Sequence, residues 1–480
     1  MNNFEPEANN GWGNEPEFAQ ALATALISAD TLFTGDVSKV SGRDRFIVDQ
    51  WTSNAPLPAI HGDPAAVALR ERGGMFAPPD EAARTAVAEL VGKYDLHDLP
   101  DRVVEMASGF EDQRRGVVER LMHSMKLMIK TAVAIADGGK VPSYEERYMA
   151  TTGQGLTVYD PKDDVEKLRA ALAKRGFDIT TSRDLADTTR AWRESLGFVP
   201  NEDLAREVLR AKKYLTELVR DVLFSKVDFG DEKFGRHLEG VSFDGYEFRP
   251  VTDLPAHATA TNTFIGGEDA DGNPLFRALF EYNIRHPMTM LDLIHITAHE
   301  GVPGHYANAV AIDVLRRSGR LGFEASVETM CTGEVAFQEG WAQVWPELLH
   351  GSREAMIAGC PTDELGNDWD VQFTTEDLQD GAKNNAGIYH QVDMLSIDAM
   401  MKRFREQFGL PDYFCDKMTR WGKNVILGPM YGPSYMIGGR VLRQAISRNG
   451  VARVAQVGLH TEGLMDLQAF REKIGCDPVV

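Results

Sequence analysis

Cysteine is scarce in this chain, with four residues among 480. Cys331, Cys360, Cys415 and Cys476 are scattered, and no two of them stand at the CxxC spacing found in many zinc and redox sites. A disulfide framework needs paired cysteines at regular spacings, and this sequence has none. We therefore expect reduced cysteines that are structural or incidental.

Long apolar runs and a basic excess are absent too. No stretch approaches the roughly 18 apolar residues of a membrane-spanning helix, and residues 1–10 lack the basic start and apolar core of a secretory signal. Lys and Arg number 51 against 72 Asp and Glu, which gives a net charge of −21. Nucleic acids and anionic membranes attract basic patches. We therefore expect no nucleic-acid or membrane partner and a cytoplasmic location, and the oligomeric state stays open.

The sequence does hold enough apolar material for a large core, since 43% of its residues are hydrophobic. Apolar residues recur at helical spacing through most of the chain, which predicts a mainly α fold with one small sheet near 240–266. We expect a flexible tail at 1–17 and an N-terminal helical region at 18–235. A metal-binding catalytic region with the sheet and further helices is expected at 236–480.

The second half of the chain can be divided more closely. The run Val241–Phe248 predicts a hairpin about the turn Asp244-Gly245, and Thr261–Gly266 predicts another strand. The Asp, Gly, Thr and Asn content of residues 359–385 predicts a loop that forms part of a cleft wall. Helices are expected, among others, at 289–301, 306–317 and 324–350.

The stretch that organises the chain holds His299, Glu300 and His305. Neutral histidine is the commonest metal ligand among side chains. Zinc peptidases usually carry two histidines four residues apart on one helix face. Here the spacing is six, which would turn His305 roughly 240° from His299 on a regular helix. Pro303-Gly304 can break the helix at the required place, although two unrelated histidines at a helix end remain the alternative.

A candidate for the third metal ligand follows on a later helical pattern. Glu339 has apolar neighbours in the sequence, including Phe337 and Trp341. A carboxylate in such surroundings needs a partner, and two histidines with one glutamate form a common zinc-ligand set. The alternative is an ordinary solvated charge on a helix.

Three blocks of this sequence resemble a bacterial family known only as domain of unknown function 885, which is similar to the gluzincin metallopeptidases. They are His-Glu-x-x-Pro-Gly-His, Glu-Gly-Trp-Ala and Ser-Tyr-x-Ile-Gly, at 299–305, 339–342 and 434–438. The resemblance implies a large helical gluzincin-like metallohydrolase with a small sheet beside the metal-binding helix, whose edge strand holds an extended substrate. It also implies one Zn²⁺ bound by His299, His305 and Glu339, with Glu300 catalytic.

Two residues are candidates for the chemistry itself. Glu300 follows a ligand directly, so its side chain points away from that ligand's direction and can reach a water on the metal as general base. A tetrahedral intermediate needs a hydrogen-bond donor opposite the metal, and Tyr435 is the candidate. A buried phenol that packs beside Tyr431 is the equal alternative for Tyr435.

Four further polar residues have open roles. Arg440 could pair with a substrate carboxylate, although a side chain that faces solvent fits its position better. His295 lies one turn before His299. It could hydrogen-bond to a metal ligand or take the place of one. The alternative is a histidine of the core whose ring nitrogens are hydrogen-bonded. His390 and Asp393 form a candidate proton-handling pair on a later helix.

Together these patterns predict a zinc-dependent hydrolase that cleaves a peptide or amide bond in a small peptide or amide-like molecule. Two other classes stay open. One is a zinc-dependent small-molecule hydrolase or lyase of a biosynthetic pathway, and the other is a non-catalytic protein that binds a metal or another ligand.

Overall fold

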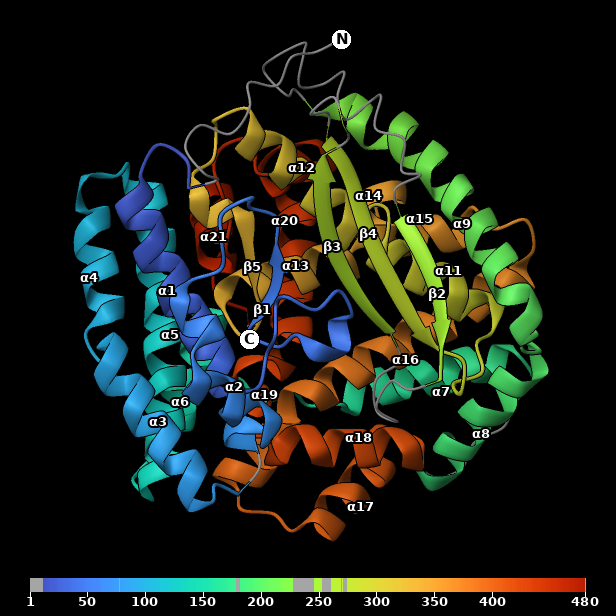
Figure 1. Ribbon diagram of the computed structural model, residues 1–480. Coiled ribbons are helices and arrows are strands. Elements are labelled where there is room, and N and C mark those ends of the chain that lie inside the picture. Colours follow the sequence, from blue (N-terminus) through green and yellow to red (C-terminus); the bar gives the residue numbers. More distant parts are fainter. Residues whose placement is uncertain are drawn as a thin grey trace.

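The computed structural model describes residues 12–76, 78–177, 182–227, 246–252, 260–268, 270 and 274–479. Within these residues the protein is mainly α with two small sheets, which confirms the predicted fold class (Figure 1). None of the helices in this part of the chain is long and apolar enough to cross a membrane.

The first helices form a bundle on one side of the molecule (Figure 1). Aspartates begin two of them, because Asp63 accepts a hydrogen bond from the amide of Ala65 and Asp80 from that of Ala83. Their apolar faces share one core, which also includes Met430 from far along the chain. The helices are α1 (Pro16–Leu32), α2 (Pro64–Glu71), α3 (Glu81–Tyr94), α4 (Leu99–Met106) and α5 (Asp112–Asp137).

The next four helices contribute to a second core together with the C-terminal half of the chain. Trp192 and Tyr148 are among its largest fully buried side chains. The domain boundary at 235 stays a prediction. The helices are α6 (Tyr144–Thr152), α7 (Lys162–Lys174), α8 (Ser182–Ser195) and α9 (Asn201–Val222).

Three strands form the larger sheet in the order β2-β4-β3. β2 (Tyr246–Val251) runs parallel to β4 (Pro274–Asn283), and β3 (Ala260–Glu268) runs antiparallel to it. The strand expected at 261–266 lies within β3, whereas the turn Asp244-Gly245 lies outside the described residues. β4 was not expected.

A second, two-stranded sheet joins the two halves of the chain. β1 (Val48–Trp51) pairs antiparallel with β5 (Val327–Thr329). The single helix expected at 324–350 is therefore wrong, because pairing with a strand far away in sequence overrides the local helical pattern. Helix structure resumes only after Thr332, whose side chain accepts from the amide of Glu334.

The C-terminal half is otherwise helical. Residues 359–385 do not form the expected loop, because most of them belong to α16, whose polar residues are buried against other elements or line a cavity. α20 contains one non-helical residue, Gly450. The helices are α11 (Met290–Glu300), α12 (His305–Arg317), α13 (Gly333–Gln343), α14 (Trp345–His350), α15 (Arg353–Ala358), α16 (Asp363–Gly387), α17 (Ile397–Phe408), α18 (Asp412–Lys423), α19 (Leu427–Met430), α20 (Gly432–Gly458) and α21 (Leu467–Ile474).

Two glycines let α13 and α20 cross in backbone contact. A Cβ atom on Gly340 would lie 2.5 Å from the carbonyl carbon of Gly438, and one on Gly438 would lie 2.1 Å from the carbonyl oxygen of Ala336. Real Cβ atoms do not approach backbone so closely, so both positions require glycine at this separation. The crossing thereby fixes the place of Glu339, which precedes Gly340 on α13.

Replacing Gly438 by alanine should lower the free energy of unfolding by about 1–3 kcal/mol, because the added methyl group forces the helices apart. Gly439→Ala is the matched control, since its Cβ would meet only side-chain atoms, at 3.5 Å and beyond. Alanine there should be neutral or stabilising by up to ~1 kcal/mol. Chemical denaturation measures both, and equal effects of the two substitutions would contradict the backbone contact.

Candidate metal centre

The first predicted ligand lies at the end of α11. This helix begins with a reciprocal cap, in which Thr289 accepts from the amide of Asp292 and Asp292 accepts from the amide of Thr289. It ends at Glu300, and α12 begins at His305. The predicted break of the helix between Gly301 and His305 is therefore confirmed.

Gly304 allows the chain to turn sharply between α11 and α12. Its amide donates to the carbonyl oxygen of Ala298 at 3.0 Å. A Cβ atom at this position would lie 1.8 Å from the carbonyl oxygen of His299, so no other residue fits without moving the backbone. The indole of Trp341 on α13 donates a hydrogen bond to the carbonyl oxygen of Pro303 at 2.7 Å and thereby stabilises the turn.

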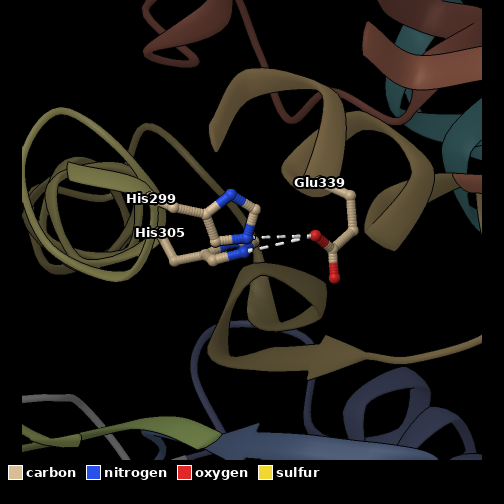
Figure 2. Close-up of side chains that lie close together, drawn as sticks. All are labelled: His299, His305 and Glu339. Carbon is tan, nitrogen blue, oxygen red and sulfur yellow. Dashed lines mark ion pairs between the residues drawn. The ribbon is translucent and has the colours of Figure 1, made fainter. Parts of the chain in front are cut away.

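The turn brings His305 back beside His299, and both face Glu339 on α13 (Figure 2). The distances from Glu339 Oε2 to the two Nε2 atoms are 3.3 Å for His299 and 3.7 Å for His305. The imidazole rings meet edge to face at 82°, with centroids 4.9 Å apart. The structure thus brings all three predicted ligands together, with one ligand atom from each within 4.8 Å of the others.

These three residues fit a zinc ion in chemistry and spacing. Two imidazole nitrogens and a carboxylate oxygen are a common zinc set, and tetrahedral bonds of about 2.1 Å place ligand atoms roughly 3.4 Å apart. Glu339 Oε2 is buried, and no described residue is aligned to donate a hydrogen bond to it. A buried carboxylate oxygen without a donor is costly, and a cation between it and the two histidines would remove that cost.

The electrostatics of the group follow from burial and from mutual attraction. Burial opposes the charge of Glu339, but the two histidines outweigh it and hold the pKa of this carboxyl well below its usual range. For His305, burial lowers the pKa, but Glu339, Glu300 and Glu328 together raise it to about 9. Burial raises the pKa of Glu300 above its ordinary value, against the opposing effect of the histidines.

Two tyrosines of α20 and its N-cap complete the surroundings of Glu339. Tyr431 donates from its hydroxyl to Glu339 Oε1 at 2.9 Å, and the hydroxyls of Tyr431 and Tyr435 lie 2.6 Å apart. Burial raises the pKa of both phenols well above the ordinary value, so both keep their protons. From the sequence, Tyr431 was expected only as a neighbour of Tyr435. Its spacing of four residues from Tyr435 on a helix was the available signal.

A cavity of about 840 Å³ opens beside this centre. His299 and Glu300 line it, together with both tyrosines. None of the described residues of β2, β3 and β4 lines it, so the strand-held substrate implied by the family resemblance finds no support here. α16, expected as a loop in the cleft wall, does form part of the wall, but as a helix.

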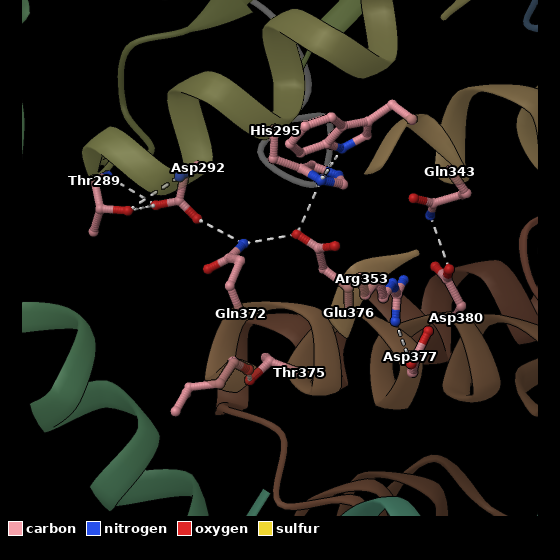
Figure 3. Close-up of polar contacts among 12 residues, drawn as sticks. Thr289, Asp292, His295, Gln343, Arg353, Gln372, Thr375, Glu376, Asp377 and Asp380 are labelled. Carbon is pink, nitrogen blue, oxygen red and sulfur yellow. Dashed lines mark hydrogen bonds and ion pairs between the residues drawn. The ribbon is translucent and has the colours of Figure 1, made fainter. Parts of the chain in front are cut away.

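A chain of polar side chains runs along one wall of the cavity from α11 to α16 (Figure 3). Gln372 donates to Asp292 Oδ1 at 3.5 Å and to Glu376 Oε1 at 2.8 Å. Glu376 Oε1 lies 3.1 Å from His295 Nδ1, which also accepts from the indole of Trp345 at 3.2 Å. An indole nitrogen only donates, so His295 carries its proton on Nε2.

The protonation of this chain is set mainly by burial. Burial keeps the pKa of His295 well below its usual value, so the imidazole is neutral. Burial also raises the pKa of Glu376 to about 8, so this carboxyl holds a proton near neutral pH and lies beside the neutral imidazole without a charge. His295 is therefore a hydrogen-bonded residue of the cavity wall, and it is not part of the ligand group found among the described residues.

The other candidates lie away from the cavity lining. The guanidinium of Arg440 lies over the ring of Tyr159, 5.3 Å from its centroid. His390 Nδ1 lies 3.1 Å from the carbonyl oxygen of Leu395, and neither His390 nor Asp393 lines the cavity.

Comparisons with known proteins leave the activity open. No protein-family model matches the chain, and no curated protein matches it. Two similar solved structures are provisionally described as lipoproteins. One, from Colwellia psychrerythraea, is 12% identical with a TM-score of 0.48, over 87% of this chain and 72% of its own. The other, of unknown function and from Shewanella oneidensis, is 15% identical with a TM-score of 0.45, over 86% and 76%.

Replacing Tyr431 by phenylalanine should weaken zinc binding by about 10- to 100-fold, because Glu339 loses the donor that orients it. Tyr435→Phe is the matched control, since its hydroxyl reaches Glu339 through that of Tyr431. It should change zinc affinity little. Competition with a chromophoric chelator measures both affinities, and equal losses would show that the two hydroxyls act as one unit.

Zinc affinity should also rise with pH up to about 9. The pKa of His305 is raised to about 9 in the metal-free protein, so below that pH a zinc ion must displace the proton of His305. The apparent affinity should then increase about tenfold per pH unit between 7 and 9, with release of one proton. Calorimetry in two buffers of different ionisation enthalpy measures the release. An affinity that does not change over this range would contradict the assignment of His305.

Proposed function

We propose that this chain is a zinc-dependent hydrolase that cleaves an amide or peptide bond in a small molecule. The observation that carries the proposal is the convergence of His299, His305 and Glu339 beside a cavity that His299 and Glu300 line. The resemblance of the three motifs to the domain of unknown function 885 family supports it.

Glu300 and Tyr435 have separate roles in the proposed hydrolysis. When bound, zinc supplies a Lewis acid that lowers the pKa of water toward about 7 and polarises a carbonyl group. Glu300 is the general base, and its raised pKa makes it a better proton acceptor. Once protonated, it can pass that proton to the leaving nitrogen. Tyr435 keeps its proton and can donate a hydrogen bond to the oxygen on which negative charge develops.

The size and lining of the cavity favour a small substrate. Its volume of about 840 Å³ lies within the range of roughly 300–1,000 Å³ typical of small-molecule sites. The polar wall of Gln372, Glu376 and His295 favours a compact polar ligand, which keeps a small-molecule hydrolase or lyase as the second candidate. A cytoplasmic location belongs to the proposal as well, and the four unpaired cysteines support it.

The proposal is tested with two variants of the centre and one control. Glu300→Gln should retain zinc and lose activity by about 10²- to 10⁴-fold, because it removes only the proton acceptor. His305→Ala should lose zinc and activity together. His390→Ala is the control and should keep both, because His390 lies outside the cavity lining.

Zinc content is measured by elemental analysis, and turnover is measured on a library of small amides, acylated peptides and esters. Zinc without turnover on any substrate would favour the binding-protein alternative. Full activity of the Glu300→Gln variant would refute the role of Glu300.

A further inference from the structure

The cationic side chains that line the cavity differ in whether they form an ion pair. Five lysines and arginines line it, and four of them form ion pairs with aspartates. Only the fifth, Lys417, has no ion pair or hydrogen bond among the described residues. The paired side chains and their partners are Arg190 with Asp187, Arg193 with Asp292, Lys383 with Asp380, and Arg405 with Asp412.

Lys417 is held among aromatic rings instead of carboxylates. It lies on α18, and its Nζ atom is 5.8 Å from the ring centroid of Phe414 and 5.2 Å from that of Trp421. Burial, with Lys383 nearby, lowers the pKa of Lys417 to about 7. An ammonium group in such a place is destabilised until a counter-ion arrives.

A short row of rings connects Lys417 to the metal centre. The ring of Trp421 lies 5.2 Å from that of Tyr431, which donates to Glu339. Lys383 stands on the same wall, with its Nζ atom 3.5 Å from the ring centroid of Tyr435. Lys417, Glu300 and His299 line the same cavity, so an anionic group held at Lys417 would leave the rest of a small molecule in the space that Glu300 and His299 also line.

We propose that Lys417, with Lys383 beside it, binds a carboxylate of the substrate, so that the substrates are acylated amino acids or short peptides with a free carboxylate. The assignment rests on the proposed hydrolase function. A chain with a net charge of −21 repels anions on average, so recognition of an acid requires a local cation that is not already neutralised. The carboxylate supplies the counter-ion that Lys417 lacks.

The test compares acids with matched neutral amides in binding. The probes are acetylated dipeptides with a free carboxylate and the same dipeptides as carboxamides. Calorimetry on the zinc-loaded Glu300→Gln protein measures affinity without turnover. This protein should bind the acids on the order of tenfold more tightly, as expected for one charge-assisted contact. Adding Lys417→Met should abolish that preference.

Lys423→Met is the matched control, because Lys423 is exposed on the same helix, and it should leave the preference unchanged. The Lys417→Met protein should be at least as stable as its parent, since it loses an uncompensated charge. Lys417→Gln carries the same test if the methionine variant does not fold.

Two results would overturn the assignment. One is no preference for acids in the parent, including no binding of any acid. The other is a preference that survives Lys417→Met, including an equal loss of affinity for acids and amides. Because no turnover is measured, the preference can be present in a protein that proves not to be a hydrolase. A failure of the hydrolase proposal is therefore distinguished from a failure of this one.

Discussion

The close crossing of α13 and α20 is the constraint on which the candidate centre depends. Gly340 and Gly438 let the two backbones touch, and this separation decides where the neighbouring side chains project. Glu339 precedes one glycine, and Tyr435 stands one turn before the other. Tyr431, at the start of the same helix, then reaches Glu339 with its hydroxyl. A wider crossing would move the carboxylate away from the phenol that orients it.

The contacts of α13 also explain the residues of two of the motifs. In Glu-Gly-Trp-Ala the glutamate faces the histidines, the glycine touches α20, and Trp341 donates to the carbonyl oxygen of Pro303. In Pro-Gly-His the glycine occupies a place where a Cβ would strike the carbonyl oxygen of His299. The two motifs are thus parts of one contact, in which α13 supports the turn that places His305.

The ligand residues could be predicted because their chemistry is local, whereas the part of the cavity wall that α16 forms could not. Spacing, a helix-breaking Pro303-Gly304 and an acid in apolar surroundings were visible in the sequence. α16 was not, because Asp, Asn and Thr have low helix propensity and its apolar residues show no clear stripe. Its polar residues are instead satisfied by other elements, as when Asn385 contacts the backbone of Tyr159 from α16. β5 was missed for a similar reason, since its partner β1 lies far away in sequence.

Two opposite charges, one in the wall of the cavity and one beside it, are kept apart at a cost to the folded protein. Glu339 Oε2 has no aligned donor, and Lys417 has no carboxylate partner among the described residues. The negative charge of Glu339 attracts the ammonium group of Lys417 and acts to raise its pKa. Direct contact would stabilise both, but the rings of Trp421 and Tyr431 stand between them in the row of contacts. A carboxylate beside the cavity that is left for a cation, and an ammonium group in its wall that is left for an anion, suit the binding of a metal ion and an acidic substrate side by side.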